Sequence, residues 1–318
     1  MISRILVPLD GSAQSIRILG PVAGLSARRN VQVALLHVLH EPGSKKDTLD
    51  RKEEVDRARR YLEHARKWLS RRGIAADAEI RSGSPAEEIR KFLTHFRPSL
   101  IAMYTYARSG LSRMVRGSVA EEVMKESEFP VFLANPSAFE HQKHHEPGFR
   151  RILVPLDGTT RSDRILGLVT DMARQHGSEV VLLHVDNPAG MLVVGPGVAM
   201  PLPPPPEDHG FLESCRKHLE AADVKARTEI VLGQPEAEIV AAAKREEAGL
   251  VAMVTHARTG FDRWLNGSVA ESVIHRVPCP VLAMRVHTPV WAGRRKPIEA
   301  LDEAIHWNSL WSGNLAGL

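Results

Sequence analysis

The sequence predicts an α/β protein in which a doubly wound parallel sheet is built twice. The segment "RILVPLDG" at 4–11 returns letter for letter at 151–158, so one structural unit is used twice in the 318 residues. Within each copy, short apolar runs alternate with segments of helical spacing. This alternation is typical of a parallel sheet covered by helices on both faces, and right-handed crossovers then wind it in both directions.

Later landmarks of the first copy return in the same order. They are "LLHV" at 35–38 and 182–185, "GSPAEEI" at 83–89 and "GQPEAEI" at 233–239, and "GSVAE" at 117–121 and 267–271. The offset is 147 residues for the first pair and 150 for the others, so a net insertion of three residues separates them. We expect four parts: a first domain at 1–138, a linker at 139–149, a second domain at 150–286 and a C-terminal tail at 287–318.

The elements of the first copy follow in order from these patterns. The apolar run "RILVPL" is predicted as a strand, and helical spacing begins at Ser15. The continuous apolar strand "VQVALLHV" comes next, then a charged helix within 45–72 and a third strand, "ADAEIRSG". Ser84 as N-cap and Pro85 at the first helical position start another helix. The segments "SLIAMYT", "GSVAEEVMKES" and "FPVFLA" complete the copy as strand, helix and strand.

Charge is concentrated in the helix predicted within 45–72. Its apolar positions keep helical spacing, at Val55, Ala58, Leu62, Ala65 and Leu69. The net charge is +7 for residues 1–150 and −3 for residues 151–318. One amphipathic helix with a solvated face explains the excess. Interleaved aromatic residues and a recognised nucleic-acid motif are both lacking, so we expect no nucleic-acid partner.

Composition bounds the class of protein. The chain is 43% hydrophobic and 25% charged, which is typical of a globular protein. No apolar run approaches the roughly 20 residues that span a bilayer, and the first strand leaves no room for a signal peptide. The two cysteines, Cys215 and Cys279, do not make a disulfide framework. We expect a cytoplasmic protein without a membrane segment. The histidines of the predicted linker, which we expect to be solvated rather than to bind a metal, are His141, His144 and His145.

In a doubly wound sheet, ligands bind beyond the carboxyl ends of the strands. Asp10 and Asp157 follow the first strand of each copy and are predicted to face that crevice. Gly117 and Ser118 open a helix there, where backbone N–H groups suit an anion. Both features have structural explanations as well. Ser118 with Glu121 forms a capping box, and an aspartate after a strand commonly forms an Asx turn.

Taken together, "ILVPLDGS", "LLHV", "GSPAEEI", "ARSGLSRMVRGSVAEEV" and "FPVFLA" resemble the universal stress protein family, and the second copy shows the same resemblance. It covers about 270 of the 318 residues. The resemblance implies two five-stranded parallel sheets of order 3-2-1-4-5, an adenine-nucleotide α-hydrolase-like fold. Some members of the family bind ATP, and others do not.

The resemblance also implies a nucleotide site. In ATP-binding members, the aspartate after strand one and the backbone after "LLH" hold adenine, and a segment G-x-x-G, nine residues, G-[ST] holds ribose and phosphates. In the first copy the implied residues are Pro8, Leu9, Asp10, Val38, Ala107, Arg108, Gly117, Ser118 and Val119. In the second copy they are Pro155, Leu156, Asp157, Val185, Ala257, Arg258, Gly267, Ser268 and Val269. ATP is the expected cofactor, and Arg108 and Arg258 are placed to assist its phosphates.

The phosphate segment departs from the family pattern. Its first two glycines are replaced by Tyr104 and Ala107 in the first copy, and by Val254 and Ala257 in the second. Each alanine takes a methyl's worth of room where the backbone would approach a phosphate. The fold therefore follows from the resemblance, whereas nucleotide binding stays an open question at both copies.

Three functions follow, in order of preference. The first is a stress-response sensor or signalling protein that binds ATP without catalytic turnover. The second is a nucleotide-independent protein-interaction module of the same family. The third is a slow ATPase. Because the chain has no Walker-type motif, no G-x-G-x-x-G after either first strand and no nucleophile with an apparent base, we expect no enzyme.

The fifth strand of each copy is the predicted partner surface. These strands begin near Pro130 and Pro280, and we expect them to be apolar sheet edges, which invite pairing. Pairing of the two domains within one chain is the prediction, with a homodimer as a further expectation.

The net insertion of the second copy lies within 187–208, a segment that follows its second strand and replaces the polar, helix-starting stretch of the first copy. Four consecutive prolines, Pro203 to Pro206, favour an extended polyproline segment there. Since the insertion leaves from the crevice end of the sheet, we predict that it covers the second site. The alternative is a surface excursion that packs elsewhere.

The C-terminal tail lies outside the repeat and is predicted to dock. Pro297 suits a first helical position, and Ile298, Leu301, Ile305 and Trp311 share one helical face. Deleting residues 296–318 should therefore lower the melting temperature or change the oligomeric state. Thermal denaturation and size-exclusion chromatography check this, and an unchanged result in both would make the tail an appendage.

Overall fold

The computed structural model of the chain describes residues 2–26, 30–40, 48–105, 119–140, 149–158, 162–187, 190–195, 198–202, 209–256 and 269–286. The chain divides into two units, a first unit at Ile2–Pro147 and a second unit that begins at Gly148. The implied phosphate segments of both units and the predicted C-terminal helix lie outside the described residues.

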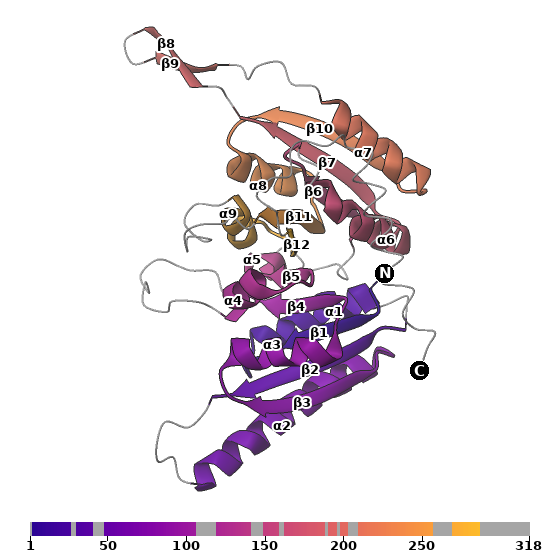
Figure 1. Ribbon diagram of the computed structural model, residues 1–318, viewed down its shortest axis with the longest axis vertical. Helices are drawn as coiled ribbons and strands as arrows, with labels where there is room; N and C mark the ends of the chain where they lie inside the picture. Colours follow the sequence, from indigo (N-terminus) through magenta and orange to yellow (C-terminus); the bar gives the residue numbers. More distant parts are fainter. Residues whose placement is uncertain are drawn as a thin grey trace. The chain divides into compact units, whose positions relative to one another are not determined.

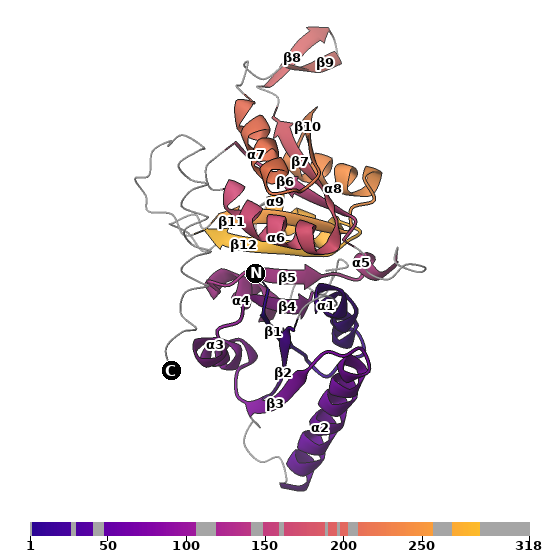
Figure 2. The same ribbon diagram turned by 90° about the vertical axis from the view of Figure 1, so that its right-hand side faces the viewer.

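The first unit is one parallel sheet with helices on its faces. Its elements are β1 (Arg4–Pro8), η1 (Ser15–Ile18), α1 (Leu19–Ser26), β2 (Gln32–Leu39), α2 (Thr48–Ser70), β3 (Ala76–Ser82), α3 (Pro85–Phe96), β4 (Leu100–Tyr104), α4 (Val119–Glu126), β5 (Val131–Ala134) and α5 (Ser137–Glu140). The strand order is β3-β2-β1-β4-β5, all parallel, which confirms the predicted 3-2-1-4-5 order. In Figure 2, α3 lies on one face of this sheet and α1 and α2 on the other.

The second unit repeats this architecture. Its elements are β6 (Arg151–Pro155), η2 (Ser162–Ile165), α6 (Leu166–His176), β7 (Glu179–Asp186), β8 (Gly190–Gly195), β9 (Val198–Leu202), α7 (Gly210–Ala221), β10 (Ala226–Leu232), α8 (Pro235–Arg245), β11 (Leu250–His256), α9 (Val269–Arg276) and β12 (Val281–Val286). The order β10-β7-β6-β11-β12 is again parallel and has the same topology (Figure 1).

The core explains the sequence pattern. The central strands β1 and β6 are buried on both faces, and this is why they are continuously apolar: Ile5, Leu6, Val7, Ile152, Leu153 and Val154 are all 0% exposed. The apolar positions Ala58, Leu62, Ala65 and Leu69 of α2 are buried, as their spacing predicts. Burial of each Val, Leu or Ile side chain in these elements contributes roughly 2 kcal/mol to the stability of its unit.

Two local features differ from the sequence predictions. Helix α3 begins with Pro85 after Ser84, as expected, but the Ser84 side chain makes no capping hydrogen bond. In the insertion, β8 and β9 form an antiparallel hairpin apart from the five-stranded sheet (Figure 1), which the sequence analysis did not predict. The polyproline segment lies outside the described residues. None of the described helices is long and apolar enough to cross a membrane.

Both thiols should be unreactive in the native protein. Cys215 and Cys279 are 1% and 2% exposed, and burial raises the pKa of the Cys279 thiol to about 12. Since the thiolate is the nucleophile, alkylation by iodoacetamide at pH 8 should be at least about 100-fold slower in buffer than in denaturant. Mass spectrometry of timed samples measures this, and labelling of native Cys279 at the rate of a free thiol would contradict the burial.

Candidate functional site

The aspartate of each repeated segment lies just beyond the end of its strand. In the first unit the Leu9 N–H donates to the Leu36 carbonyl at 2.8 Å, and the exposed Asp10 follows. The Ser12 N–H donates to Asp10 Oδ1 at 2.9 Å, so the predicted Asx turn is present. Gly11 has a φ of 85°, a left-handed conformation that turns the chain back toward the sheet.

The second unit builds the same strand end. The Leu156 N–H donates to the Leu183 carbonyl at 2.8 Å, Asp157 is exposed, and Gly158 has a φ of 75°. The repeat in sequence is therefore a repeat in backbone conformation. In both units a carboxylate is presented to solvent at the carboxyl end of the central strand.

A buried imidazole holds this strand end in each unit. His37 Nδ1 lies 2.7 Å from the Leu9 carbonyl oxygen, and His184 Nδ1 lies 2.7 Å from that of Leu156. Because a carbonyl oxygen only accepts, the ring N–H donates in both cases. The two imidazoles are 7% and 6% exposed, so each bond is shielded from water. Each ties the second strand to the residue before the aspartate, a role that sequence reasoning missed.

The adjacent strand runs beyond the last residue pair of the central strand. β1 pairs with β2 as far as Pro8 and Leu36, and the half-buried Val38 lies two residues further along β2. In the second unit, β6 pairs with β7 as far as Pro155 and Leu183, and Val185 is the equivalent residue. In each unit the second strand thus extends past the central strand beside the aspartate, and we call this strand end the notch.

The structure brings together the implied adenine residues of each unit. Those of the first unit are Pro8, Leu9, Asp10 and Val38, and those of the second are Pro155, Leu156, Asp157 and Val185. On the phosphate side, Val119 is the first residue of α4 and Val269 the first residue of α9. The other implied residues lie outside the described ones: Ala107, Arg108, Gly117, Ser118, Ala257, Arg258, Gly267 and Ser268.

Tyr104, which replaces a family glycine, has an aromatic neighbour. Its side chain is buried, with 8% exposure, and its ring stacks on Phe139 of α5, with centroids 6.0 Å apart and an interplanar angle of 25°. The Arg17 guanidinium lies over the other ring of this pair, 4.4 Å from the Phe139 centroid. Tyr104 is thus part of a packed aromatic pair.

One aromatic position distinguishes the two sites. Tyr61 of α2 donates its hydroxyl to the Ser12 carbonyl at 3.0 Å and lies 3.0 Å from Ser15 Oγ. Burial raises the pKa of Tyr61, the hydrogen bond with Ser15 opposes the rise, and the charge of Asp10 adds to it. Tyr61 therefore anchors the first aspartate loop to α2 by hydrogen bonds.

In the second unit, Phe211 stands 150 residues after Tyr61 and replaces these hydrogen bonds by packing. A Cβ built on Gly158 would lie 3.4 Å from the Phe211 ring, and that ring meets His184 edge-on with centroids 5.3 Å apart. In the second unit an apolar side chain therefore packs beside Gly158 of the aspartate loop. The exchange was readable from the repeat, by aligning the two copies at the offset of 150 residues that follows the insertion.

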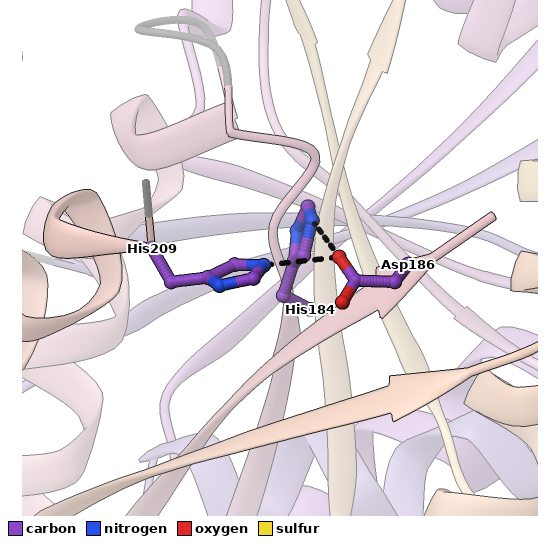
Figure 3. A group of neighbouring side chains, drawn as sticks. All are labelled: His184, Asp186 and His209. Atoms are coloured by element: carbon purple, nitrogen blue, oxygen red, sulfur yellow. Dashed lines mark hydrogen bonds and ion pairs between the residues drawn. The ribbon is translucent and has the colours of Figure 1, made fainter. Parts of the chain in front are cut away.

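A second difference is a cluster of metal-ligating side chains, shown in Figure 3. His184, Asp186 and His209 each offer one ligand atom, and these atoms lie within 4.8 Å of one another. The His184 Nε2 to Asp186 Oδ1 distance is 3.3 Å, and that from His209 Nε2 to the same oxygen is 3.0 Å. Sequence reasoning missed this cluster, although "LLHVD" against "LLHVL" marks Asp186 as a change between the copies.

Comparison with known proteins places this geometry in a family. The model of the "Universal stress protein family" matches residues 1–135 and 148–285. Universal stress protein MJ0531 of Methanocaldococcus jannaschii is 32% identical over 146 residues, covering 43% of this chain and 82% of that protein. Universal stress protein Rv2005c of Mycobacterium tuberculosis is 23% identical over 294 residues, covering 88% of this chain and 96% of that protein.

A solved structure shows the same fold over most of the chain. The crystal structure of a universal stress protein from Archaeoglobus fulgidus aligns with a TM-score of 0.70 at 22% identity. The alignment covers 89% of this chain and 96% of that one, so it includes both units.

The contact between Gly11 and His37 can be tested by a matched pair of alanine substitutions. Gly11 and Gly73 both have positive φ, at 85° and 73°, but an added Cβ at Gly11 would lie 3.2 Å from His37 Cε1, whereas Gly73 is open. Gly73→Ala should cost about 1–2 kcal/mol for the left-handed conformation, and Gly11→Ala about 1 kcal/mol more. Urea unfolding of both variants measures the difference. Equal costs would mean that the imidazole yields without loss.

Proposed function

Because the chain belongs to the universal stress protein family, we propose that its second unit binds an adenine nucleotide, ATP in the first instance, as a sensor or signalling protein without catalytic turnover. The observation that supports this most directly is the notch at the end of each sheet. There an exposed aspartate is presented by a strand end that a buried imidazole holds in place. Such a notch at the carboxyl ends of parallel strands is where doubly wound folds bind ligands.

In this proposal the adenine ring enters between Asp157 and Val185. The Asp157 carboxylate accepts a hydrogen bond from the exocyclic amine, and the Val185 backbone pairs with the ring edge. Two features support the assignment. Asp157 is exposed, and the last residue of β7 that pairs with β6 is Leu183, two residues before Val185. The ring also needs an apolar surface, and Leu156, at 3% exposure, belongs to the packed floor at this strand end.

The phosphates are assigned to the start of α9. Gly267 and Ser268 immediately precede Val269, the first residue of that helix, so the helix dipole favours a negative charge there. Arg258 would assist as a cation. The first unit offers the same arrangement at Gly117 and Ser118 before α4. We assign the second unit precedence because "VTHARTG" stays nearer the family segment than "YTYARSG" does.

The replaced glycines favour a second candidate function. If Ala107 and Ala257 prevent the backbone from approaching a phosphate, the two units keep the family fold and act as a nucleotide-independent protein-interaction module. The two functions differ in one observable, the binding of ATP by the purified chain. A slow ATPase differs from both by the release of phosphate.

Titration calorimetry tests the proposed nucleotide site. Asp157→Ala removes one hydrogen bond at the adenine edge, so ATP should bind about 2- to 10-fold more weakly, as expected for about 0.5–1.5 kcal/mol. Gly267→Val removes room and a charge-assisted contact at the phosphates, so the loss should be larger, about 10-fold or more. Asp10→Ala is the matched control because Asp10 is the counterpart of Asp157 in the first unit. This substitution should leave the binding isotherm of the second site unchanged.

The wild type also decides between the functions. If it shows no heat and no thermal shift at millimolar ATP, the interaction module replaces the nucleotide sensor. Phosphate released in proportion to time and protein concentration, and abolished by Gly267→Val, would instead establish an ATPase.

A further inference from the structure

We propose that His184, Asp186 and His209 form a binding site for a divalent transition-metal ion of the Zn²⁺ type in the second unit. His184 and Asp186 alternate with Val185 along β7, so the period of the strand sets them on one face. His209 is the residue before α7 and, as Figure 3 shows, its ring turns toward the same carboxylate. Two imidazoles and one carboxylate suit ions of the Zn²⁺ type, whereas Mg²⁺ and Ca²⁺ prefer oxygen ligands alone.

The distances fit a tetrahedral ion. With metal–ligand bonds of about 2.0–2.1 Å, neighbouring ligand atoms of a tetrahedron lie about 3.3 Å apart. The two measured separations from Asp186 Oδ1 are 3.3 Å to His184 Nε2 and 3.0 Å to His209 Nε2. The third separation, between the ligand atoms of the two imidazoles, is within 4.8 Å, so a tetrahedral ion can enter between the three atoms once the two rings close toward about 3.3 Å. Three protein ligands leave a fourth position for water or a further ligand.

The orientation of His184 gives a second argument. Its Nδ1 donates to the Leu156 carbonyl at 2.7 Å, and this bond directs its Nε2 toward Asp186 Oδ1, which lies 3.3 Å away. A ring nitrogen bonded to a backbone carbonyl is also how metal-ligating histidines are oriented.

The first unit shows that the cluster is not required by the fold. His37 matches His184 in place and in its bond to the preceding loop, at 2.7 Å in both. At the positions of Asp186 and His209, however, the first copy carries Leu39 and Arg59. The imidazole that orders the strand end is common to both units, whereas the other two donors belong to the second alone.

Two of the three ligands also flank the insertion in the sequence. Residues 187–208 lie between Asp186 and His209, so an ion bound to both would join the two ends of a 22-residue excursion. The contact between His209 and Asp186 is a single part-buried hydrogen bond of 3.0 Å. Closing a loop of this length costs conformational entropy, and a metal clip offsets that cost more strongly than one hydrogen bond does.

The test is calorimetric titration of ZnCl₂ into the full chain after treatment with a chelator and without nucleotide. The background carries His141→Gln, His144→Gln and His145→Gln, because the histidines of the linker are independent candidates for zinc. We expect one site per chain. Asp186→Asn keeps the shape and an acceptor oxygen for His209 but is a poor ligand, so zinc should bind at least about 10- to 100-fold more weakly. His209→Gln should act similarly, and His95→Gln, which removes an exposed histidine of α3, should change nothing.

Cobalt gives a second readout that does not depend on stability. Co²⁺ added to the same background should produce the visible absorption of a tetrahedral ion with nitrogen and oxygen ligands, and Asp186→Asn should abolish it. Circular dichroism and the melting temperature of each metal-free variant show whether it is folded. If the folded wild type binds zinc no more tightly than folded Asp186→Asn, the three side chains are a hydrogen-bonded cluster only, and the proposal is wrong. Loss of all zinc binding on replacing the linker histidines would overturn it as well.

Discussion

The hydrogen bond from a buried imidazole to the carbonyl before each aspartate is the interaction on which both candidate sites depend. A buried carbonyl that lacks a partner costs about 1–3 kcal/mol, and at the end of a strand the ladder no longer supplies one. His37 and His184 supply it from the neighbouring strand, at 2.7 Å in each unit. This fixes the chain where it leaves the sheet, and therefore the position from which Asp10 and Asp157 are presented. In each unit, the histidine of "LLH" supplies the donor of this hydrogen bond, and the leucine before the aspartate in "RILVPLDG" supplies the acceptor.

On this common frame the two units differ in what covers the strand end. The first unit holds its aspartate loop by the Tyr61 hydroxyl, whereas the second packs Phe211 against Gly158 and His184. The exchange removes two hydrogen bonds around the loop, and the distance between the centroids of the aromatic ring and the imidazole is 6.3 Å in the first unit and 5.3 Å in the second. Because the frame itself is unchanged, such exchanges alter the chemistry at the strand end without altering the topology. The two sites are therefore expected to have different ligand preferences despite identical eight-residue segments.

The sequence was sufficient for the fold because the fold depends on period and order. Continuous apolar strands, the helical spacing of α2 and the position of Pro85 all appear in the structure as predicted. The metal-ligating cluster could not be predicted in this way, because it depends on the approach of His209 to Asp186 across a segment that is three residues longer than its counterpart in the first unit and differs from it in sequence. The hairpin β8–β9 was missed for a related reason, since its other residues are all apolar and its glycines and prolines interrupt them, so no polar–apolar alternation marks a strand. Spacing sets which residues share a face, and long-range packing decides which faces meet.

Strand β7 links the two proposals through the alternation of its side chains. His184 and Asp186 project to one face, and Val185 between them carries the backbone assigned to the adenine edge. An ion bound by the flanking side chains would restrict the backbone of Val185, because both of its neighbours would be held by coordination. Ordering of the notch before a nucleotide arrives lowers the entropy cost of binding, so the two ligands would favour each other through β7 without touching. No such coupling is expected in the first unit. Of the three equivalent positions there, only His37 carries a metal-ligating side chain, because the other two are Leu39 and Arg59. If both proposals hold, the second unit is the one in which a metal ion and a nucleotide act on the same strand.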